Sequence, residues 1–194
     1  MEHKGEMTKA LLGEKFKELV VKKSFDKITI KMITDEAGVI RPTFYNYFQD
    51  KYEVMEWLLW EDVFKNVMEL IRMDMTRSAI QMLFRKIDVD KEYYIKVFEV
   101  EGQNSFEEMM IKDVCEVARE AVKRHPLELM EKTAIITEDT LLKFQSVTLV
   151  NGIKYWLLYY RDVSGDEALE FYEFLMSHSI LDLLGEDEKG KVLF

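Results

Sequence analysis

The sequence is poor in the residues that cross-link or bend a chain. It has one cysteine, Cys115, two prolines and eight glycines among its 194 residues. A single cysteine excludes a disulfide within one chain and is typical of proteins kept in a reducing compartment. The scarcity of proline and glycine favours helices, and no long run alternates Val, Ile or Thr with polar residues as strands do. We therefore expect an all-α protein.

Long uncharged apolar segments are also absent. No stretch reaches the roughly 18 apolar residues that a membrane-spanning helix needs. The N-terminal residues, MEHKGEMTK, lack the apolar centre of a signal peptide. These two absences predict a protein without membrane contact, located in the cytoplasm.

Motifs for catalysis and metal binding are missing as well. The sequence has no Walker loop, HExxH, paired CxxC or GxSxG, and its three histidines lie far apart. His178 and Asp182 are four residues apart and could chelate a metal, but such a pair is more often an exposed or interface contact. We therefore expect no enzyme, no metal site and no cofactor.

Negative charge dominates the chain but is unevenly distributed. The formal net charge is −10, yet residues 1–51 carry ten Lys/Arg against eight Asp/Glu, whereas residues 52–194 carry 17 against 29. An acidic surface repels phosphate, so any contact with DNA must be confined to the N-terminal region.

Helical periodicity is present throughout. Residues 8–23 have one apolar face, and Thr29 can cap a short helix that ends at Gly38. Asp50 with Glu53 predicts the start of a helix that continues through residue 72. Further helices are predicted at residues 106–124, 138–161 and 168–184, two of them after Ser-x-x-Glu capping boxes.

The segment AGVIRPTFYNYFQDK, residues 37–51, is unusually aromatic. Phe44 and Phe48 are four residues apart and are predicted to face inward. Two short helices around a glycine turn, with a third helix before them, indicate a helix-turn-helix whose second helix enters the DNA major groove. A three-helix packing unit without a DNA role is the alternative that the pattern alone leaves open.

The predicted partner of this segment is double-stranded DNA. Arg41 has the donor geometry to read guanine, the tyrosine hydroxyls can donate to phosphate, and Lys51 can meet a phosphate. Pro42 fits the first turn of a helix and could offer an apolar contact to a thymine methyl. The candidate DNA-binding residues are Thr29, Arg41, Pro42, Thr43, Tyr45, Asn46, Tyr47 and Lys51.

The stretch FDKITIKMITDEAGVIRPTFYNYFQDKYEV resembles the DNA-binding region of the TetR family of bacterial regulators. The resemblance covers about residues 8–54 and includes the Ala37–Gly38–Val39 turn. Ile40 departs from it, because the family often has a capping Ser or Thr there, and this cap is worth about 1 kcal/mol. The resemblance implies a helix-turn-helix domain at residues 1–53, the head, and a helical regulatory and dimerisation domain at residues 54–194, the body.

Control through the body is a second implication of the resemblance. It implies an inducer cavity for an unknown small-molecule effector. The candidate lining residues of this cavity are Tyr94, Phe98, Phe106, Met110, Phe144, Tyr155 and Tyr159. Ordinary core packing is the competing interpretation of these residues. RPTFYNYFQDKYEVMEWLLWE and EGQNSF are also similar to the DhaS-like subgroup, which implies a partner protein in place of a small molecule.

The last two long helices are apolar around more than one stripe. TLLKFQSVTLVNGIKYWLLYY and ALEFYEFLMSHSILDLL each carry rings and aliphatic side chains over much of their circumference. A buried central helix would explain the first of them. A second burial surface explains both, and the family pairs the corresponding helices in a homodimer that matches palindromic DNA.

Overall fold

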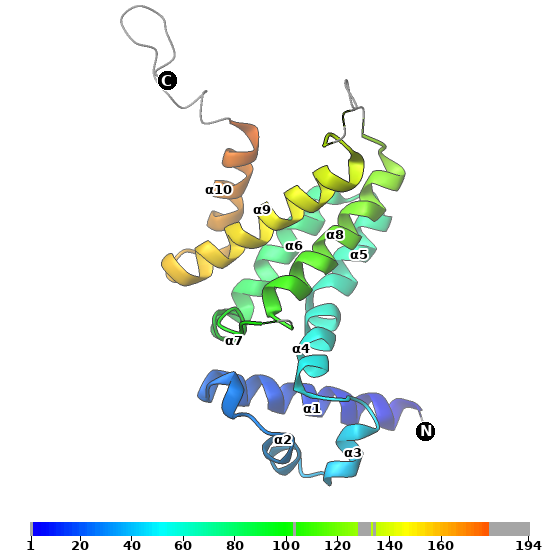
Figure 1. Cartoon of the computed structure of the whole chain (residues 1–194), viewed down its shortest axis with the longest axis vertical. Helices are drawn as coiled ribbons and strands as arrows, with labels where there is room; N and C mark the ends of the chain where they lie inside the picture. The colour runs from blue at the N-terminus through cyan, green and yellow to red at the C-terminus, as the bar shows by residue number, and fades with distance from the viewer. Residues whose placement is uncertain (1, 103, 128–132, 134, 179–194) are drawn as a thin grey trace, which may run out of the picture.

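The computed structural model describes residues 2–102, 104–127, 133 and 135–178 and confirms the all-α prediction, since no strand occurs among them (Figure 1). The elements are α1 Glu2–Lys22, η1 Phe25–Lys27, α2 Ile30–Glu36, α3 Arg41–Tyr45, α4 Lys51–Leu59, η2 Trp60–Phe64, α5 Lys65–Arg72, α6 Thr76–Val89, α7 Lys91–Val97, α8 Phe106–Arg124, α9 Glu138–Tyr159 and α10 Gly165–Ser177. The predicted last helix extended to residue 184, and residues 179–184 lie outside the described ranges, as does Asp182. Within those ranges, no helix is both long and apolar enough to span a membrane.

The head and the body lie at opposite ends of the structure. In Figure 1, α1 crosses above α2 and α3 at the bottom, and α4 leads upward into α5 to α10. The long helices α8 and α9 pack side by side, and α10 packs mainly on α6 and α9. Helix α3 and the last two helices are therefore far apart, and α4 connects the two regions.

The predicted helix starts are confirmed by hydrogen bonds. The Thr29 and Asp50 side chains accept from the first-turn amides of α2 and α4. Ser164 and Glu167 form the complete reciprocal capping box of α10. At α8, Ser105 Oγ accepts from an amide in the first turn, but the Ser105 amide donates to the Gly102 carbonyl, so this box is only half formed.

The turn between α2 and α3 depends on Gly38. Its φ is +66°, a left-handed conformation that side chains with a Cβ adopt at a cost. The Val39 amide donates to the Thr34 carbonyl at 3.0 Å, and the Gly38 amide donates to the Asp35 carbonyl at 3.2 Å. This is a Schellman motif, which ends α2 and sets the direction in which α3 leaves.

The helix predicted to run without interruption from Asp50 to residue 72 contains a π-helical segment, η2. The buried residues of this stretch come in adjacent pairs: Val54–Met55, Leu58–Leu59, Val63–Phe64 and Val67–Met68. The pairs are four residues apart except at Leu58–Leu59 to Val63–Phe64, where they are five apart. A π turn accommodates the extra residue and keeps every pair on the core face.

Aromatic and aliphatic side chains pack together inside the head, as part of one buried cluster that continues into the body. Phe44 is fully buried and Phe48 is 2% exposed, which confirms that both rings face inward. Their centroids are 5.6 Å apart, and Phe48 also contacts Trp57 of α4 edge-on. Ile33 of α2 and Phe16 of α1 are fully buried in the same cluster. These contacts fix the position of α3 relative to α1.

Close contacts join the head to the rest of the molecule. A Cβ on Gly13 of α1 would lie 2.7 Å from the Trp57 ring, so the two helices approach closely only because this residue is glycine. Lys17 of α1 forms ion pairs with Asp62 of η2, at 2.9 Å, and with Asp90 before α7. The orientation of α1 is therefore coupled to both α4 and the body.

Candidate nucleic-acid interface

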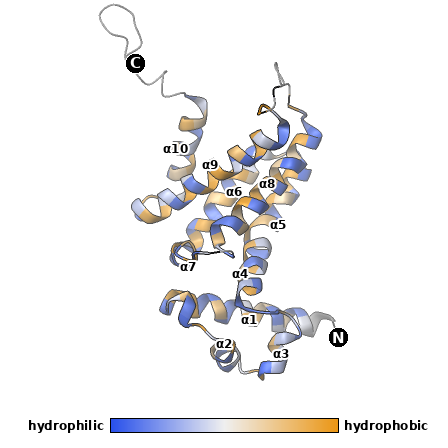
Figure 2. Ribbon diagram, in the orientation of Figure 1, coloured by the Kyte–Doolittle hydropathy of each residue, from blue (hydrophilic) through white to orange (hydrophobic). Residues whose placement is uncertain are grey.

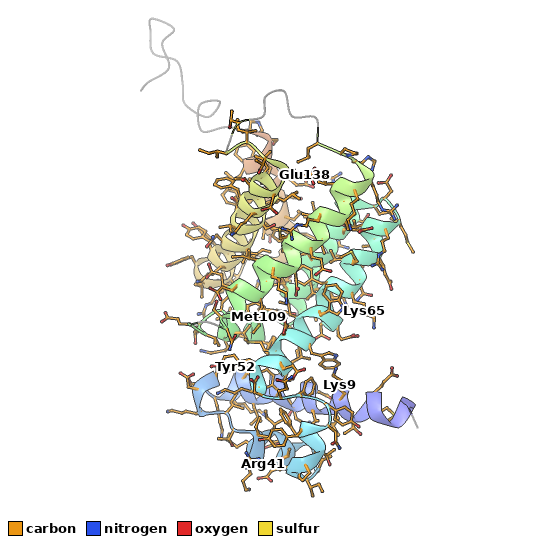
Figure 3. The ribbon with its side chains drawn as sticks, turned by 45° about the vertical axis from the view of Figure 1, so that its right-hand side comes forward. Lys9, Arg41, Tyr52, Lys65, Met109 and Glu138 are labelled. Carbon is orange, nitrogen blue, oxygen red and sulfur yellow. The ribbon has the colours of Figure 1, made fainter. Side chains whose placement is uncertain are left out.

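The outer face of α3 lies at the end of the head that points away from the body. Figure 3 shows Arg41 at this end, directed outward. Because Phe44 is buried on the opposite side, its neighbours in the helix are turned to the surface: Arg41, Pro42, Tyr45 and Asn46 are exposed. A short helix with one aromatic anchor thus presents a polar face of the size that a major groove accepts.

Arg41 and Tyr45 form a pair along this face. Arg41 Nη2 donates to Tyr45 Oη at 2.9 Å, Nε donates to the same oxygen at 3.3 Å, and the guanidinium lies 5.5 Å from the ring centroid. The ring holds the arginine along the helix and leaves the Nη1 donors for a base edge. Fixing a long side chain before binding lowers the entropy lost in the complex.

The other predicted residues of α2 and α3 have more local roles. Thr29 Oγ1 accepts from the Met32 amide at 3.3 Å and caps α2. Pro42 occupies the first turn of α3, where no side chain caps the helix because Ile40 is the N-cap residue. Thr43 and Tyr47 are half-buried, and the Tyr47 hydroxyl lies beside Gly5 of α1.

Lys51, predicted to contact a phosphate, has a structural role within the head. Its ammonium donates to three backbone carbonyls of the η1 turn, those of Phe25 at 2.8 Å, Ile28 at 3.3 Å and Asp26 at 3.4 Å. It also lies 4.3 Å from the Phe25 ring centroid. An ammonium has three donors, so all are engaged. Burial lowers the pKa of Lys51, which fits a side chain directed into the head.

Replacing Lys51 should therefore affect folding more than DNA contact. We expect Lys51→Met to lower the free energy of unfolding by about 2 kcal/mol, because charged hydrogen bonds to three carbonyls are lost. The exposed Lys27, in the same turn, is the matched control, and Lys27→Met should change stability by less than about 0.5 kcal/mol. Urea unfolding measures both. Lys51→Met could instead keep full stability and lower by about one unit the slope of the logarithm of DNA affinity against the logarithm of salt concentration. That result would support the predicted phosphate contact.

One exposed residue of this face was not predicted as a contact. Ile40 is 71% exposed immediately before α3, next to Arg41. In the sequence it was considered only as a missing helix cap. An apolar residue that is exposed where a helix cap is expected is the signal in the sequence that could have drawn attention to it.

The seven candidate effector-pocket residues do not line one cavity. Tyr94, Phe98, Phe106 and Met110 are at most 4% exposed and pack on one another in the core, with ring centroids 4.9 and 5.8 Å apart. Phe144, Tyr155 and Tyr159 are 51–70% exposed on α9. The core interpretation holds for the first four. The other three belong to the molecular surface, which helical spacing alone could not distinguish from a cavity wall.

A cavity does occur in the body, but at another place. It has a volume of about 240 Å³ and lies among α5, α6, α8, α9 and α10. Its apolar walls include Ile71, Leu83, Val117 and Leu149, and its polar groups are Thr76, Gln145, Ser146 and Tyr172. Among the residues that the structure describes, no charged side chain lines it. Burial raises the pKa of Tyr172, so its hydroxyl is a neutral donor in this setting.

The outer face of α9 and α10 is a large exposed apolar surface. Figure 2 shows hydrophobic residues along both helices at the edge of the body. The surface includes an apolar groove of about 790 Å³. The exposed large side chains of the whole outer face are Phe144, Tyr155, Tyr159, Tyr160, Phe171, Phe174, Leu175 and Met176. We call these eight residues the α9–α10 surface. Monomeric proteins rarely leave so many large apolar side chains together in water.

Polar contacts hold α10 in place on the other side. Arg85 of α6 binds the Asp166 carboxylate with two hydrogen bonds, at 2.8 and 3.0 Å. Arg77 binds Glu173 in the same way, at 3.1 and 3.2 Å. These bidentate pairs fix the helix against α6 while its apolar residues point outward. The ion pairs with α6 therefore hold α10, and with it the α9–α10 surface, in a defined orientation.

Comparison with known proteins agrees with this architecture. Residues 17–57 match the family described as bacterial regulatory proteins, tetR family. A curated relative, the HTH-type dhaKLM operon transcriptional activator DhaS of Lactococcus lactis, is 25% identical over 95 residues. That alignment spans 49% of this chain and about half, 51%, of the relative. The family match at residues 17–57 contains α2, the Gly38 turn and α3. The resemblance seen in the sequence is therefore confirmed.

Solved structures share the fold over most of the chain. The dihydroxyacetone kinase operon activator DhaS superposes with a TM-score of 0.60 at 18% identity, covering 88% of this chain and 94% of that chain. A TetR transcriptional regulator from Streptococcus agalactiae gives 0.63 at 18% identity, covering 90% and 96%. At this identity the likeness concerns the fold, and it extends from the head through the body. The family and the curated relative are transcriptional regulators, in line with the expectation that the chain is no enzyme.

Proposed function

We propose that this member of the TetR family of bacterial transcriptional regulators acts as a homodimer that binds palindromic operator DNA in the cytoplasm. The head, residues 1–53, contacts the DNA, and the body, residues 54–194, dimerises and receives the signal. The observation that carries the DNA-binding part is the outward Arg41–Tyr45 pair on a helix anchored by Phe44.

The roles of the α3 residues follow from their positions. Arg41 reads a guanine edge in the major groove, with Tyr45 as its support. Thr43 and Asn46 contact the DNA backbone or neighbouring bases, and Pro42 and Ile40 offer apolar contacts to thymine methyl groups. Thr29 at the start of α2 and the half-buried Tyr47 each donate a hydroxyl hydrogen bond to a DNA phosphate.

Arg41→Ala should relax base preference without unfolding the head. We expect discrimination at one position of each half-site to fall by about 1–3 kcal/mol, because a guanidinium that reads a base edge is removed. Tyr45→Phe, which loses only the hydroxyl that accepts from Arg41, should cause a smaller loss at the same position. Binding to a library of single-base operator variants measures both. Equal weakening on all sequences would instead assign Arg41 to a phosphate.

Dimerisation through the α9–α10 surface is supported by exposure and by geometry. A two-fold axis through this surface would bury the same eight residues of both copies, as an isologous interface requires. It would also place two heads on the same side of the dimer, as two half-sites of a palindrome require. The alternative of a buried central helix does not fit α9, because Phe144 and Tyr159 are 67% and 70% exposed.

The body cavity supports control by a small, uncharged effector. Its volume of about 240 Å³ is below the roughly 300–1,000 Å³ of most ligand sites, so the effector must be small or the cavity must widen. An effector alters DNA binding only if it binds one spacing of the heads better than the other. Lys17, which joins α1 to both Asp62 and Asp90, is positioned to link body and head.

The alternative is a DhaS-like regulator whose body docks a partner protein in place of a small molecule. The similarity to an operon activator of that name favours this reading. The variant Ala79→Trp distinguishes a small-molecule effector from a docked partner protein, because the larger side chain fills the cavity from α6. Loss of the response to the cellular signal, with DNA binding intact, supports a small molecule. An unchanged response supports docking on the outside of the body.

A further inference from the structure

A further hollow lies between the head and the body, outside the α3 face, the body cavity and the α9–α10 surface. This cleft has a volume of about 380 Å³ and is lined from three helical segments: α1, the continuous α4–η2 stretch and α8. Figure 3 shows Lys9 on its α1 side, near the base of α4. Trp57 and Trp60 line it from the α4–η2 stretch, and Lys112, Asp113 and Glu116 line it from α8.

The charges of the cleft are mostly negative. Four carboxylates line it, from Glu53 and Glu56 of α4 and from Asp113 and Glu116 of α8, against two ammonium groups. One of these, Lys112, is paired with Glu56 at 2.8 Å. The other, Lys9, lies over the rings of Phe48 and Trp57. The cleft therefore carries an excess of negative charge beside two indole rings.

Asp113 is the unusual member of this set. It is only 5% exposed, and among the described residues its buried Oδ2 atom has no hydrogen-bond partner. A buried carboxylate oxygen without a partner is costly, so such an atom calls for an explanation. Burial raises the pKa of Asp113 to about 7, against the partial opposing effect of Lys112. Its charge is thus poorly compensated by the chain itself.

The aromatic wall already binds an ammonium group of this protein. Lys9 Nζ lies 5.0 Å from the Trp57 ring centroid and 5.1 Å from that of Phe48, which is cation–π geometry. Trp60 offers a second indole on the same cleft. A metal ion fits less well, because no three acidic, histidine or cysteine side chains of the described residues are arranged to hold one. An organic cation needs one carboxylate and one ring.

We propose that this cleft is a binding site for a small aliphatic amine or diamine, whose ammonium is bound by Asp113 and whose carbon chain packs on Trp60. Glu116 provides the second carboxylate at the cleft for the other end of a diamine. Because α1 belongs to the head and α8 to the body, an amine seated here contacts both and can favour one orientation of the head.

The test uses the full-length protein labelled with nitrogen-15 and titrated with 1,4-diaminobutane. The chain has three tryptophans, so its indole N–H signals are few and resolvable, and Trp156 lies in the body away from the cleft. We expect saturable shifts of the Trp57 and Trp60 signals with Trp156 unchanged. The uncharged analogue 1,4-butanediol and an equal ionic strength of sodium or magnesium chloride should leave all three in place.

Variants separate the proposed contact from general charge effects. Asp113→Asn keeps the shape and removes a charge that is expensive to bury, so it should fold, and we expect it to bind the diamine at least tenfold more weakly. The matched control is Glu120→Gln, two turns further along α8 and outside the cleft, which should bind as the parent does. Trp60→Leu tests the ring without touching the carboxylate and should also weaken binding.

The pH dependence gives an independent check. Asp113 is ionised above a pKa of about 7, so affinity for the diamine should rise about tenfold from pH 6 to pH 8. The other ionisable groups at the cleft are Glu53, Glu56, Glu116, Lys9 and Lys112. The proposal is wrong if Asp113→Asn binds within twofold of the parent, if butanediol or magnesium causes the same shifts, or if the two indoles do not respond.

Discussion

Phe171→Glu should convert the protein into a monomer. Phe171 is 59% exposed in the chain and lines the apolar groove between α9 and α10. In an isologous interface the substitution introduces two carboxylates into apolar surroundings. Burying an unpaired charge costs about 3–5 kcal/mol, so the two together should weaken the dimer by more than about a thousandfold. Sedimentation or light scattering measures this directly.

Loss of the dimer should also lower the affinity for operator DNA. Two heads on one rigid dimer bind a palindrome with an affinity that neither head reaches alone, so we expect operator affinity to fall at least a hundredfold. Met73→Glu is the matched control, because Met73 is 68% exposed at the end of α5 and outside the α9–α10 surface. If Phe171→Glu stayed dimeric and bound the operator normally, dimerisation would have to use a different surface.

Phe44→Ala should unfold the head. Phe44 of α3 is fully buried, and its ring centroid lies 5.6 Å from those of both Phe48 and Tyr45. Replacing a buried phenylalanine by alanine costs about 3–5 kcal/mol, a large part of the roughly 5–15 kcal/mol that holds most domains together. Urea unfolding should show this loss, and DNA binding should disappear with it.

The neighbouring ring provides the comparison. Tyr45 is 48% exposed, so Tyr45→Ala should change stability by less than about 1 kcal/mol but still weaken DNA binding, because Arg41 loses its support. The two variants therefore separate folding from recognition in adjacent residues. Equal stability losses in both would mean that the tyrosine is part of the head's core and not of its outer face.

The sequence predicted the parts of the fold that depend on local chemistry. Thr29, Asp50 and Ser164 cap helices as expected, and Gly38 ends α2, because these effects involve residues three or four positions apart. The inward direction of Phe44 and Phe48 follows from the same helical spacing. The π segment η2 was missed, although the five-residue step from Leu58 to Val63 was visible in the sequence.

Side-chain environments set by distant residues were not predictable in this way. Lys51 follows the α3 segment and was assigned to phosphate, yet its ammonium binds carbonyls more than twenty residues earlier in the chain. Tyr94 and Tyr155 are similar residues on apolar helices, but one is 1% and the other 51% exposed. Only the packing of α7 against α1 and α9, and the position of α9 at the surface, distinguish them.

The central claim is that a dimer of this chain recognises an inverted repeat through α3. Selection of DNA from a random pool by the purified protein, at physiological salt with competitor DNA, tests it most directly. We predict enrichment of an inverted repeat whose half-sites contain a guanine that Arg41→Ala no longer selects. Enrichment of no sequence, in the presence as well as the absence of cell lysate, would contradict the claim and leave the three head helices as a packing unit.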